Sequence, residues 1–144
     1  MKIDVKKLNP SAILPTRGSS EAAGYDLYAC IDEKEVVIKP GETKKIGTGL
    51  SFAVPSGYFG AIFARSGLAA KGLRPANCVG VADSDYRGEY IVALHNDSSL
   101  DMAVSHGDRI AQLVVMPYLS VEFNETDELD STARGTGGFG STGK

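Results

Sequence analysis

Residues 50–63 read LSFAVPSGYFGAIF, and this stretch decides the fold. Residues 50–54 alternate large apolar side chains with small ones, which is the period of a β-strand that buries one face. A Pro-Ser-Gly turn signal occupies 55–57, and a second run, aromatic and aliphatic, fills 58–63. The stretch therefore predicts two short strands joined by a turn.

The same pattern recurs along the chain. Further runs rich in β-branched or aromatic side chains occupy residues 35–39, 90–94 and 109–116. The turn signals between the runs are Asn9-Pro10, Lys39-Pro40-Gly41, His95-Asn96-Asp97 and Ser105-His106-Gly107-Asp108. Only Ser66 to Lys71 looks helical, which is too little for βαβ units and excludes a parallel doubly wound sheet. We expect an all-β domain, an antiparallel jelly-roll-like barrel or sandwich with one short helix.

Composition limits the class of protein. The 144 residues fit one domain, and 42% hydrophobic with 23% charged residues is typical of a globular chain. A net charge of −3 disfavours a general nucleic-acid binder. The start, MKIDVKKLNP, lacks the apolar stretch of a signal peptide, and no apolar run is long enough to span a membrane. Two distant cysteines favour reduced thiols over a zinc site. We therefore expect a cytoplasmic protein that binds neither nucleic acid nor membrane.

The C-terminal stretch differs from the rest. Residues 134–144 read RGTGGFGSTGK, and such a glycine-rich segment cannot hold a packed conformation alone, because ordering glycine costs the most backbone entropy. The simple interpretation is a frayed tail. However, one cation, one aromatic ring and two hydroxyls among exposed backbone N–H groups suit closure over an anionic ligand that carries a ring. We predict a β-barrel domain at 1–126 and a flexible arm at 127–144.

Four further segments place small, polar or charged residues where strands favour apolar ones. They are AGYDL at 23–27, ARSGLA at 64–69, NCVGVADSDYRGE at 77–89 and GDRIAQL at 107–113.

Each of these segments also has an ordinary interpretation. Ser66 beside Arg65 makes either an anion site at a helix start or a plain serine N-cap. The third segment predicts a hairpin whose turn bears three carboxylates, one of which could act as a general base. For Asp85 and Glu89 a solvated acidic turn is the better interpretation. Gln112 in an apolar strand is either a satisfied core residue or a ligand contact.

In this order, the segments AGYDL, ARSGLA, NxxGxxDSDYRG, GDRIAQL and RGxGGFGSTG resemble the five motifs of the trimeric dUTP nucleotidohydrolases, the dUTPases. The resemblance runs from about residue 10 to the C-terminus. It implies hydrolysis of dUTP to dUMP and pyrophosphate by attack at the α-phosphorus. That reaction keeps uracil out of DNA and supplies dUMP for thymidylate synthesis.

The resemblance also assigns roles to residues. Asp83 would activate the attacking water, and Tyr86 would pack on the deoxyribose and leave no room for a 2′-hydroxyl. Asn77 and the backbone from Cys78 to Gly80 would read uracil. The remaining contacts would be Arg65, Ser66, Gly67 and Gln112 along the phosphates, Arg134 at the γ-phosphate with Gly140, Ser141 and Thr142 beside it, and Phe139 stacked on the uracil ring.

The cofactor implied by the resemblance is Mg²⁺, bound by the three phosphates and by water. No residue would bind the metal directly, which suits an ion that dehydrates reluctantly. Asp26 would hold water molecules on the metal. The resemblance further implies a homotrimer in which each active site draws motifs from all three chains.

Two departures from the family pattern stand out. Ala82 occupies a position that is usually isoleucine or leucine, so a cavity is expected unless a neighbour fills it. Lys71-Gly72-Leu73 is one residue shorter than the common pattern, which affects a loop rather than the chemistry.

Two other functions compete with hydrolysis of dUTP. A dCTP deaminase would share the architecture, but its recognition segment and tail resemble this sequence less. A nucleotide-sensing protein would keep the pocket and lose turnover. The presence of Asp83, Gln112, Arg134 and Phe139 together favours hydrolysis, and a purely structural jelly-roll module would need none of them.

Overall fold

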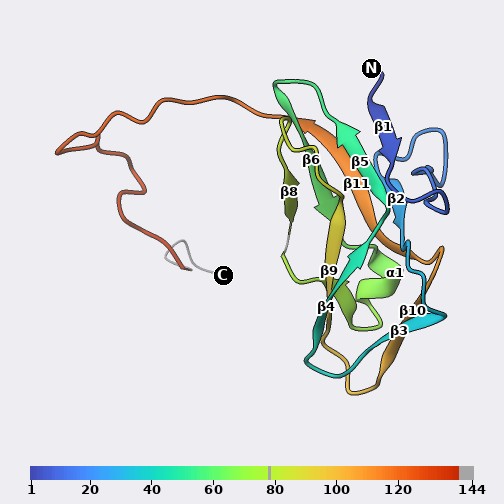
Figure 1. Ribbon diagram of the computed structural model, residues 1–144. Helices are drawn as coiled ribbons and strands as arrows, with labels where there is room; N and C mark the ends of the chain where they lie inside the picture. Colours follow the sequence, from blue (N-terminus) through green and yellow to red (C-terminus); the bar gives the residue numbers. More distant parts are fainter. Residues whose placement is uncertain (78, 140–144) are drawn as a thin grey trace.

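The computed structural model describes residues 1–77 and 79–139 (Figure 1). Cys78, Gly140, Ser141 and Thr142, which bear sequence predictions, therefore lie outside the described residues. The elements in chain order are β1 (Asp4–Lys7), β2 (Tyr25–Tyr28), β3 (Glu35–Ile38), β4 (Thr43–Gly47), β5 (Leu50–Ala53), β6 (Tyr58–Phe63), α1 (Ser66–Ala69), β7 (Leu73–Pro75), β8 (Gly80–Ala82), β9 (Ile91–Asn96), β10 (Met102–Ser105) and β11 (Arg109–Pro117).

Within the described residues every strand pair is antiparallel, and the prediction of an all-β fold with one short helix is confirmed. A four-stranded sheet runs in the order β2-β11-β6-β8, and a three-stranded sheet in the order β4-β9-β7. The pairs β1-β5 and β3-β10 complete the barrel. In Figure 1 the four-stranded sheet has β8 at one side and β2 toward the other.

The core lies between these sheets and takes side chains from nearly all of them. Its fully buried members include Leu27, Ile38, Leu50, Leu94 and Ile110. β5 is more enclosed than its alternation predicts, because the Ser51 hydroxyl donates to the Arg87 carbonyl at 2.7 Å and is covered by that loop. Both faces of this strand are thus buried, rather than one.

Two local predictions need correction. Residues 77–89 do not form a hairpin: β8 pairs with β6, whereas the next strand, β9, pairs with β4 and β7, so the segment crosses between two sheets. The expected turn at 95–97 begins later, because β9 continues through Asn96. The buried Asn96 amide donates to the carbonyls of Ile38 and Leu100, which fixes the chain where it leaves the strand.

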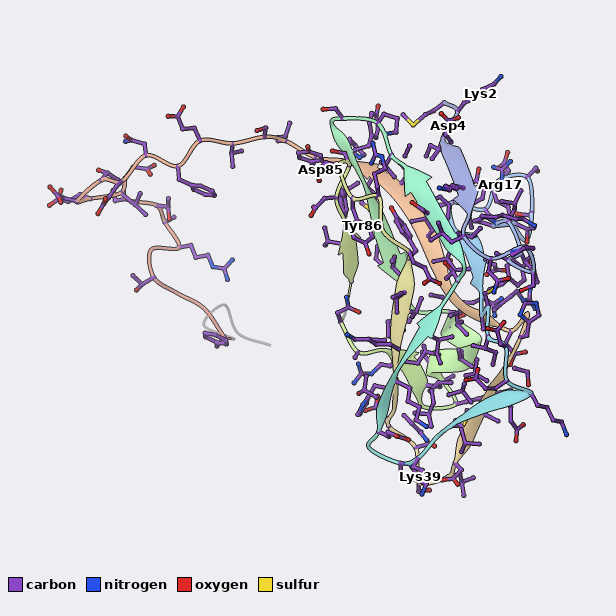
Figure 2. The ribbon with its side chains drawn as sticks, viewed as in Figure 1. Lys2, Asp4, Arg17, Lys39, Asp85 and Tyr86 are labelled. Carbon is purple, nitrogen blue, oxygen red and sulfur yellow. The ribbon has the colours of Figure 1, made fainter. Side chains whose placement is uncertain are left out.

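The C-terminal segment leaves the barrel after β11. Residues 118–139 contain neither helix nor strand and extend away from the sheets (Figure 1). The segment departs beside the loop that bears Asp85 and Tyr86, which Figure 2 labels, and Tyr118 lines one groove with Asp83 and Asp85. In the part of the chain that the structure describes, no helix has the length and apolar character needed to cross a bilayer.

Candidate active site

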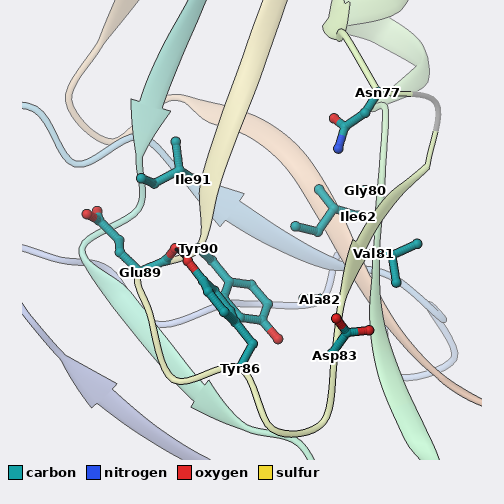
Figure 3. Close-up of a pocket in the computed structure, with 10 residues that line it drawn as sticks. All are labelled: Ile62, Asn77, Gly80, Val81, Ala82, Asp83, Tyr86, Glu89, Tyr90 and Ile91. Carbon is teal, nitrogen blue, oxygen red and sulfur yellow. Dashed lines mark hydrogen bonds between the residues drawn. The ribbon is translucent and has the colours of Figure 1, made fainter.

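A pocket of about 200 Å³ lies against β8, and we call it the β8 pocket (Figure 3). Its lining residues are Ile62, Asn77, Gly80, Val81, Ala82, Asp83, Tyr86, Glu89, Tyr90 and Ile91. Four of the predicted site residues, Asn77, Gly80, Asp83 and Tyr86, thus gather in one place. They do so because β8 is an edge strand, so the segments on both sides of it are free to turn over the same surface.

Backbone contacts hold the loop at 83–89 in shape. The Tyr86 N–H donates to the Asp83 carbonyl at 3.1 Å, which closes a turn. The Tyr86 hydroxyl donates to the Glu89 carbonyl at 2.9 Å, and the Arg87 guanidinium donates to the Ser84 carbonyl at 2.7 Å. These bonds present the Asp83 carboxylate and the Tyr86 ring at the same mouth.

The Asp83 side chain is exposed and available for proton transfer. Among the described residues, no hydrogen bond or ion pair engages its carboxylate. A carboxylate with unoccupied lone pairs at the mouth of a pocket can accept a proton from a bound water molecule.

The structure corrects the interpretation of Glu89 as part of a solvated acidic turn. It is partly buried rather than solvated, because its Oε1 accepts a hydrogen bond from the Gly49 N–H at 2.7 Å. Glu89 therefore ties the loop to the turn between β4 and β5, and it lines the β8 pocket. Sequence reasoning missed this because the partner lies 40 positions away in the chain.

Beneath the pocket lies Tyr90, whose side chain is only 1% exposed. Burial raises the pKa of its phenol above the ordinary value, and the nearby Arg87 partly opposes that shift. Its hydroxyl has no hydrogen-bond partner among the described residues.

A second pocket, of about 430 Å³, lies where β2, β11 and α1 meet, and we call it the cationic pocket. Its lining residues are Gly18, Ala22, Ala23, Gly24, Asp26, Arg65, Ser66, Gly67, Arg109 and Gln112. Arg65 Nε lies 2.7 Å from Asp26 Oδ1, and Arg109 Nη1 lies 3.4 Å from Asp26 Oδ2. Two cations share one carboxylate, so an excess of positive charge faces the pocket.

A β-bulge explains why Arg109 was not foreseen. In a regular strand, residues three apart point to opposite faces, so Arg109 and Gln112 would not line one site. The register of β11 against β2 shifts between Arg109 and Ala111. Such a bulge re-aims a side chain, and it brings the arginine to the face of the glutamine. The sequence signal was available only as the arginine within GDRIAQL.

Gln112 is held in place on both sides. Its Nε2 donates to the Ala64 carbonyl at 2.9 Å, and its Oε1 lies where a side chain at Gly24 would stand. Position 24 must therefore be glycine for the Gln112 side chain to approach the backbone this closely.

Ser66 and Gly67 stand exposed at the start of α1, where Arg65 occupies the N-cap position without a side-chain cap bond. The serine is thus not the N-cap, and its hydroxyl is free to face the pocket.

The predicted arm residues do not join either pocket in the single chain. Arg134 Nε donates to the Gly137 carbonyl at 2.9 Å, a contact within the arm, and Phe139 is fully exposed. The exposed apolar side chains Leu119 and Phe123, at 87% and 92%, lie on the same segment.

The two pockets lie at opposite edges of one sheet. β8 and β2 are the edge strands of the four-stranded sheet, separated by β11 and β6, and at typical strand spacing that is about 14 Å. The pockets share no lining residue. An all-β protein with a carboxylate-bearing pocket at one edge and a cationic pocket at the other has the parts of a nucleotide-hydrolysing enzyme.

Comparison with known proteins identifies the family. The model of the dUTPase family matches residues 10–143. The deoxyuridine 5'-triphosphate nucleotidohydrolase of Nautilia profundicola is 50% identical over 145 residues and covers all of both chains. The enzyme of the same name from Oryza sativa subsp. japonica is 46% identical over 98% of this chain and 80% of its own.

Comparison with solved structures points to the same family. A dUTPase variant of Staphylococcus bacteriophage 80alpha with dUpNHpp superimposes with a TM-score of 0.85 at 28% identity, covering 99% of each chain. The dUTPase of phage phi11 of S. aureus, in a variant described for its structural Mg(II) ion, has a TM-score of 0.81 at 25% identity over 91% of this chain and all of that one. The chain belongs to the dUTPase family.

Proposed function

We propose that the chain hydrolyses dUTP to dUMP and pyrophosphate, with the base and sugar in the β8 pocket and the triphosphate in the cationic pocket. The observation that supports this most is the opposite chemistry of the two pockets in a member of the dUTPase family. One has an apolar floor with a ring and a carboxylate at its mouth. The other has two arginines and a glutamine, which suit phosphate oxygens.

In the proposed reaction Asp83 accepts a proton from water, whose oxygen forms a bond to the α-phosphorus. The bond from the α-phosphorus to its bridging oxygen breaks, and pyrophosphate leaves with the electron pair. This assignment is supported by the position of the Asp83 carboxylate, exposed at the pocket mouth and without a partner among the described residues. Arg65, Ser66, Gly67 and Gln112 position the phosphates, so catalysis rests mainly on alignment and charge.

Substrate selection is proposed to rest on the walls of the β8 pocket. The Tyr86 ring packs on the deoxyribose, and its hydroxyl bond to the Glu89 carbonyl holds the ring where a 2′-hydroxyl would clash. Asn77 and the backbone at Gly80 read the uracil edge. A nucleotide that leaves buried polar groups unpaired is rejected strongly, which separates uracil from cytosine.

The residues of the cationic pocket fit a Mg²⁺ ion held by substrate phosphates and water. Each Asp26 oxygen accepts from an arginine and keeps a further lone pair for a metal-bound water molecule. Among the described residues, no three His, Cys, Asp or Glu side chains gather as a metal cage. When bound, the ion would neutralise charge on the phosphate oxygens.

We further infer a homotrimer with shared sites, in which the β8 pocket of one copy faces the cationic pocket of another. Their separation at opposite sheet edges supports this, as do the exposed apolar side chains of Val81, Leu119 and Phe123.

The arm at 127–144 closes over the nucleotide: Phe139 stacks on the base, and Arg134 reaches the γ-phosphate beside Gly140, Ser141 and Thr142. The half-buried free thiol of Cys30 suits work in the reducing cytoplasm.

The test is product analysis with purified protein and Mg²⁺, in separate reactions with dUTP, dCTP, dTTP and UTP. Selective conversion of dUTP to dUMP and pyrophosphate is expected. Release of inorganic phosphate, conversion of dCTP to a deaminated product, or tight dUTP binding without turnover would each contradict the proposal.

A further inference from the structure

Two small residues lie side by side where β6 pairs with β8, and one of them, Ala82, lines the β8 pocket. Gly60 of β6 and Ala82 of β8 are direct cross-strand partners, so their Cβ positions point to the same face of the sheet. Both are small, and Ala82 is buried. Two small residues side by side leave a hollow under the strand that leads into Asp83.

The Tyr90 ring and a methyl group of Leu113 share the space over Gly60. A Cβ built on Gly60 would stand 3.0 Å from Leu113 Cδ1, 3.0 Å from the Tyr90 hydroxyl oxygen and 3.4 Å from a carbon of the Tyr90 ring. In Figure 3 the hydroxyl end of Tyr90 points to the side of Ala82 and Asp83. Tyr90 lines the β8 pocket together with Ala82, so its ring lies beside the space that a small residue at 82 leaves.

Tyr90 also supports the ring that faces the sugar. The ring centroids of Tyr86 and Tyr90 lie 6.1 Å apart at an interplanar angle of 36°. Tyr90 also packs against Phe52 of β5, at 4.4 Å between centroids. Tyr90 thus connects the exposed ring of Tyr86 to a buried ring of the core.

We propose that Tyr90 is a positioning residue for sugar selection, and that Gly60, Ala82 and Tyr90 form one packing unit that sets the depth at which the Tyr86 ring stands. The inference rests on the proposed function, because it takes the deoxyribose to lie on Tyr86. Without the Tyr90 ring, Tyr86 sinks toward the hollow and the wall that excludes a 2′-hydroxyl recedes. UTP then gains access, while dUTP keeps its own contacts.

The kinetic test compares kcat/KM for dUTP and for UTP in five variants: Y90F, Y90V, A82I, A82I/Y90V and a core control, I38V. Y90V is expected to lower the preference for dUTP over UTP by about tenfold or more, mainly through a lower KM for UTP. Y90F keeps the ring and is expected to retain the preference. A82I forces an isoleucine against Tyr90 and is expected to lower it.

The double variant gives the sharpest result. In A82I/Y90V the isoleucine refills the hollow that the tyrosine leaves, so the preference is expected to recover most of the loss seen in either single variant. Thermal midpoints are expected to follow the same non-additive pattern. I38V lies in the β3-β10 pair, away from the pocket, and is expected to lower the midpoint without changing the preference.

Unchanged preference in both Y90V and A82I would overturn the proposal, and so would effects that simply add in the double variant. If Y90V does not fold, A82I and the double variant still decide the matter. A wild-type chain that does not hydrolyse dUTP would overturn the proposed function instead, and the thermal midpoints would then test the packing unit alone.

Discussion

The two pockets at the edges of the four-stranded sheet are built by different means. The β8 pocket is shaped by backbone hydrogen bonds within its loop and by aromatic packing beneath it. The cationic pocket is shaped by side chains: two arginines on one carboxylate and a glutamine held by a carbonyl. Changes to the first are therefore expected to alter chemistry and choice of nucleotide, and changes to the second to alter the strength of phosphate binding.

The largest expected effect comes from Asp83 in the β8 pocket. D83N keeps the shape of the side chain and removes the proton acceptor, so kcat is expected to fall by about 10²-fold to 10⁴-fold while a non-hydrolysable dUTP analogue still binds. D85N on the same exposed loop is the matched control and is expected to keep near-normal turnover. Near-normal turnover in D83N would refute the assignment of the base.

The next largest effect is expected from removal of the arm, the segment that we propose closes over the pockets. A chain ending at residue 126 is expected to keep the thermal midpoint of the barrel, since residues 127–139 bury no side chain in it. Its kcat/KM for dUTP is expected to fall by about 10²-fold, because the triphosphate is no longer aligned or shielded from water. Full activity in the shortened chain would show that the arm has no part in turnover.

A smaller effect is expected in the cationic pocket. R65Q removes a charge that we propose faces the phosphates, so KM for dUTP is expected to rise by about tenfold to a hundredfold with a smaller change in kcat. K44Q, at a surface lysine on β4 that pairs with Glu42, is the control for loss of one positive charge. Equal effects of R65Q and K44Q would mean that overall charge, and not the pocket, attracts the nucleotide.

The smallest predicted effect concerns Tyr90 and pH. Burial raises the pKa of its phenol above the ordinary value of 10.0, so the unfolded chain loses this proton at lower pH than the folded chain. The contribution of Tyr90 to stability is thus present below about pH 10 and is lost as pH rises through the folded pKa. Thermal midpoints of wild type are expected to fall faster than those of Y90F above pH 10. Parallel curves would contradict this.

Much of the fold could be predicted from local pattern. The alternation at 50–54 and the apolar run at 109–116 found β5 and β11, because those strands are long or regular enough to show a period. β1 could not be found, because it is exposed along its whole length, and β8, which has only three residues, was expected only as part of a hairpin. Which strands pair with each other also could not be predicted from the local sequence pattern, so the crossing from β8 to β9 was taken for a hairpin.

In the candidate site, too, local pattern placed some residues, whereas others depend on how the strands pair. Motif residues close in sequence, such as Asp83 and Tyr86, lie together in the β8 pocket because a turn joins them, and their roles stay predictions. Arg109, Glu89 and Tyr90 were missed, since their roles depend on a bulge, a bond from Gly49 and a hollow beside Gly60. Each of these is a property of strand pairing rather than of spacing. The assigned roles of the arm residues stay predictions.

The central claim is that one active site is assembled from the β8 pocket of one copy and the cationic pocket of another. D83N and R65Q chains, unfolded together in equal amounts and refolded, test it through kcat/KM for dUTP. Random mixing in a shared-site trimer predicts activity at roughly a quarter of the wild-type sites, well above either variant refolded alone. Activity equal to the mean of the two separate variants would mean that each chain holds a whole site.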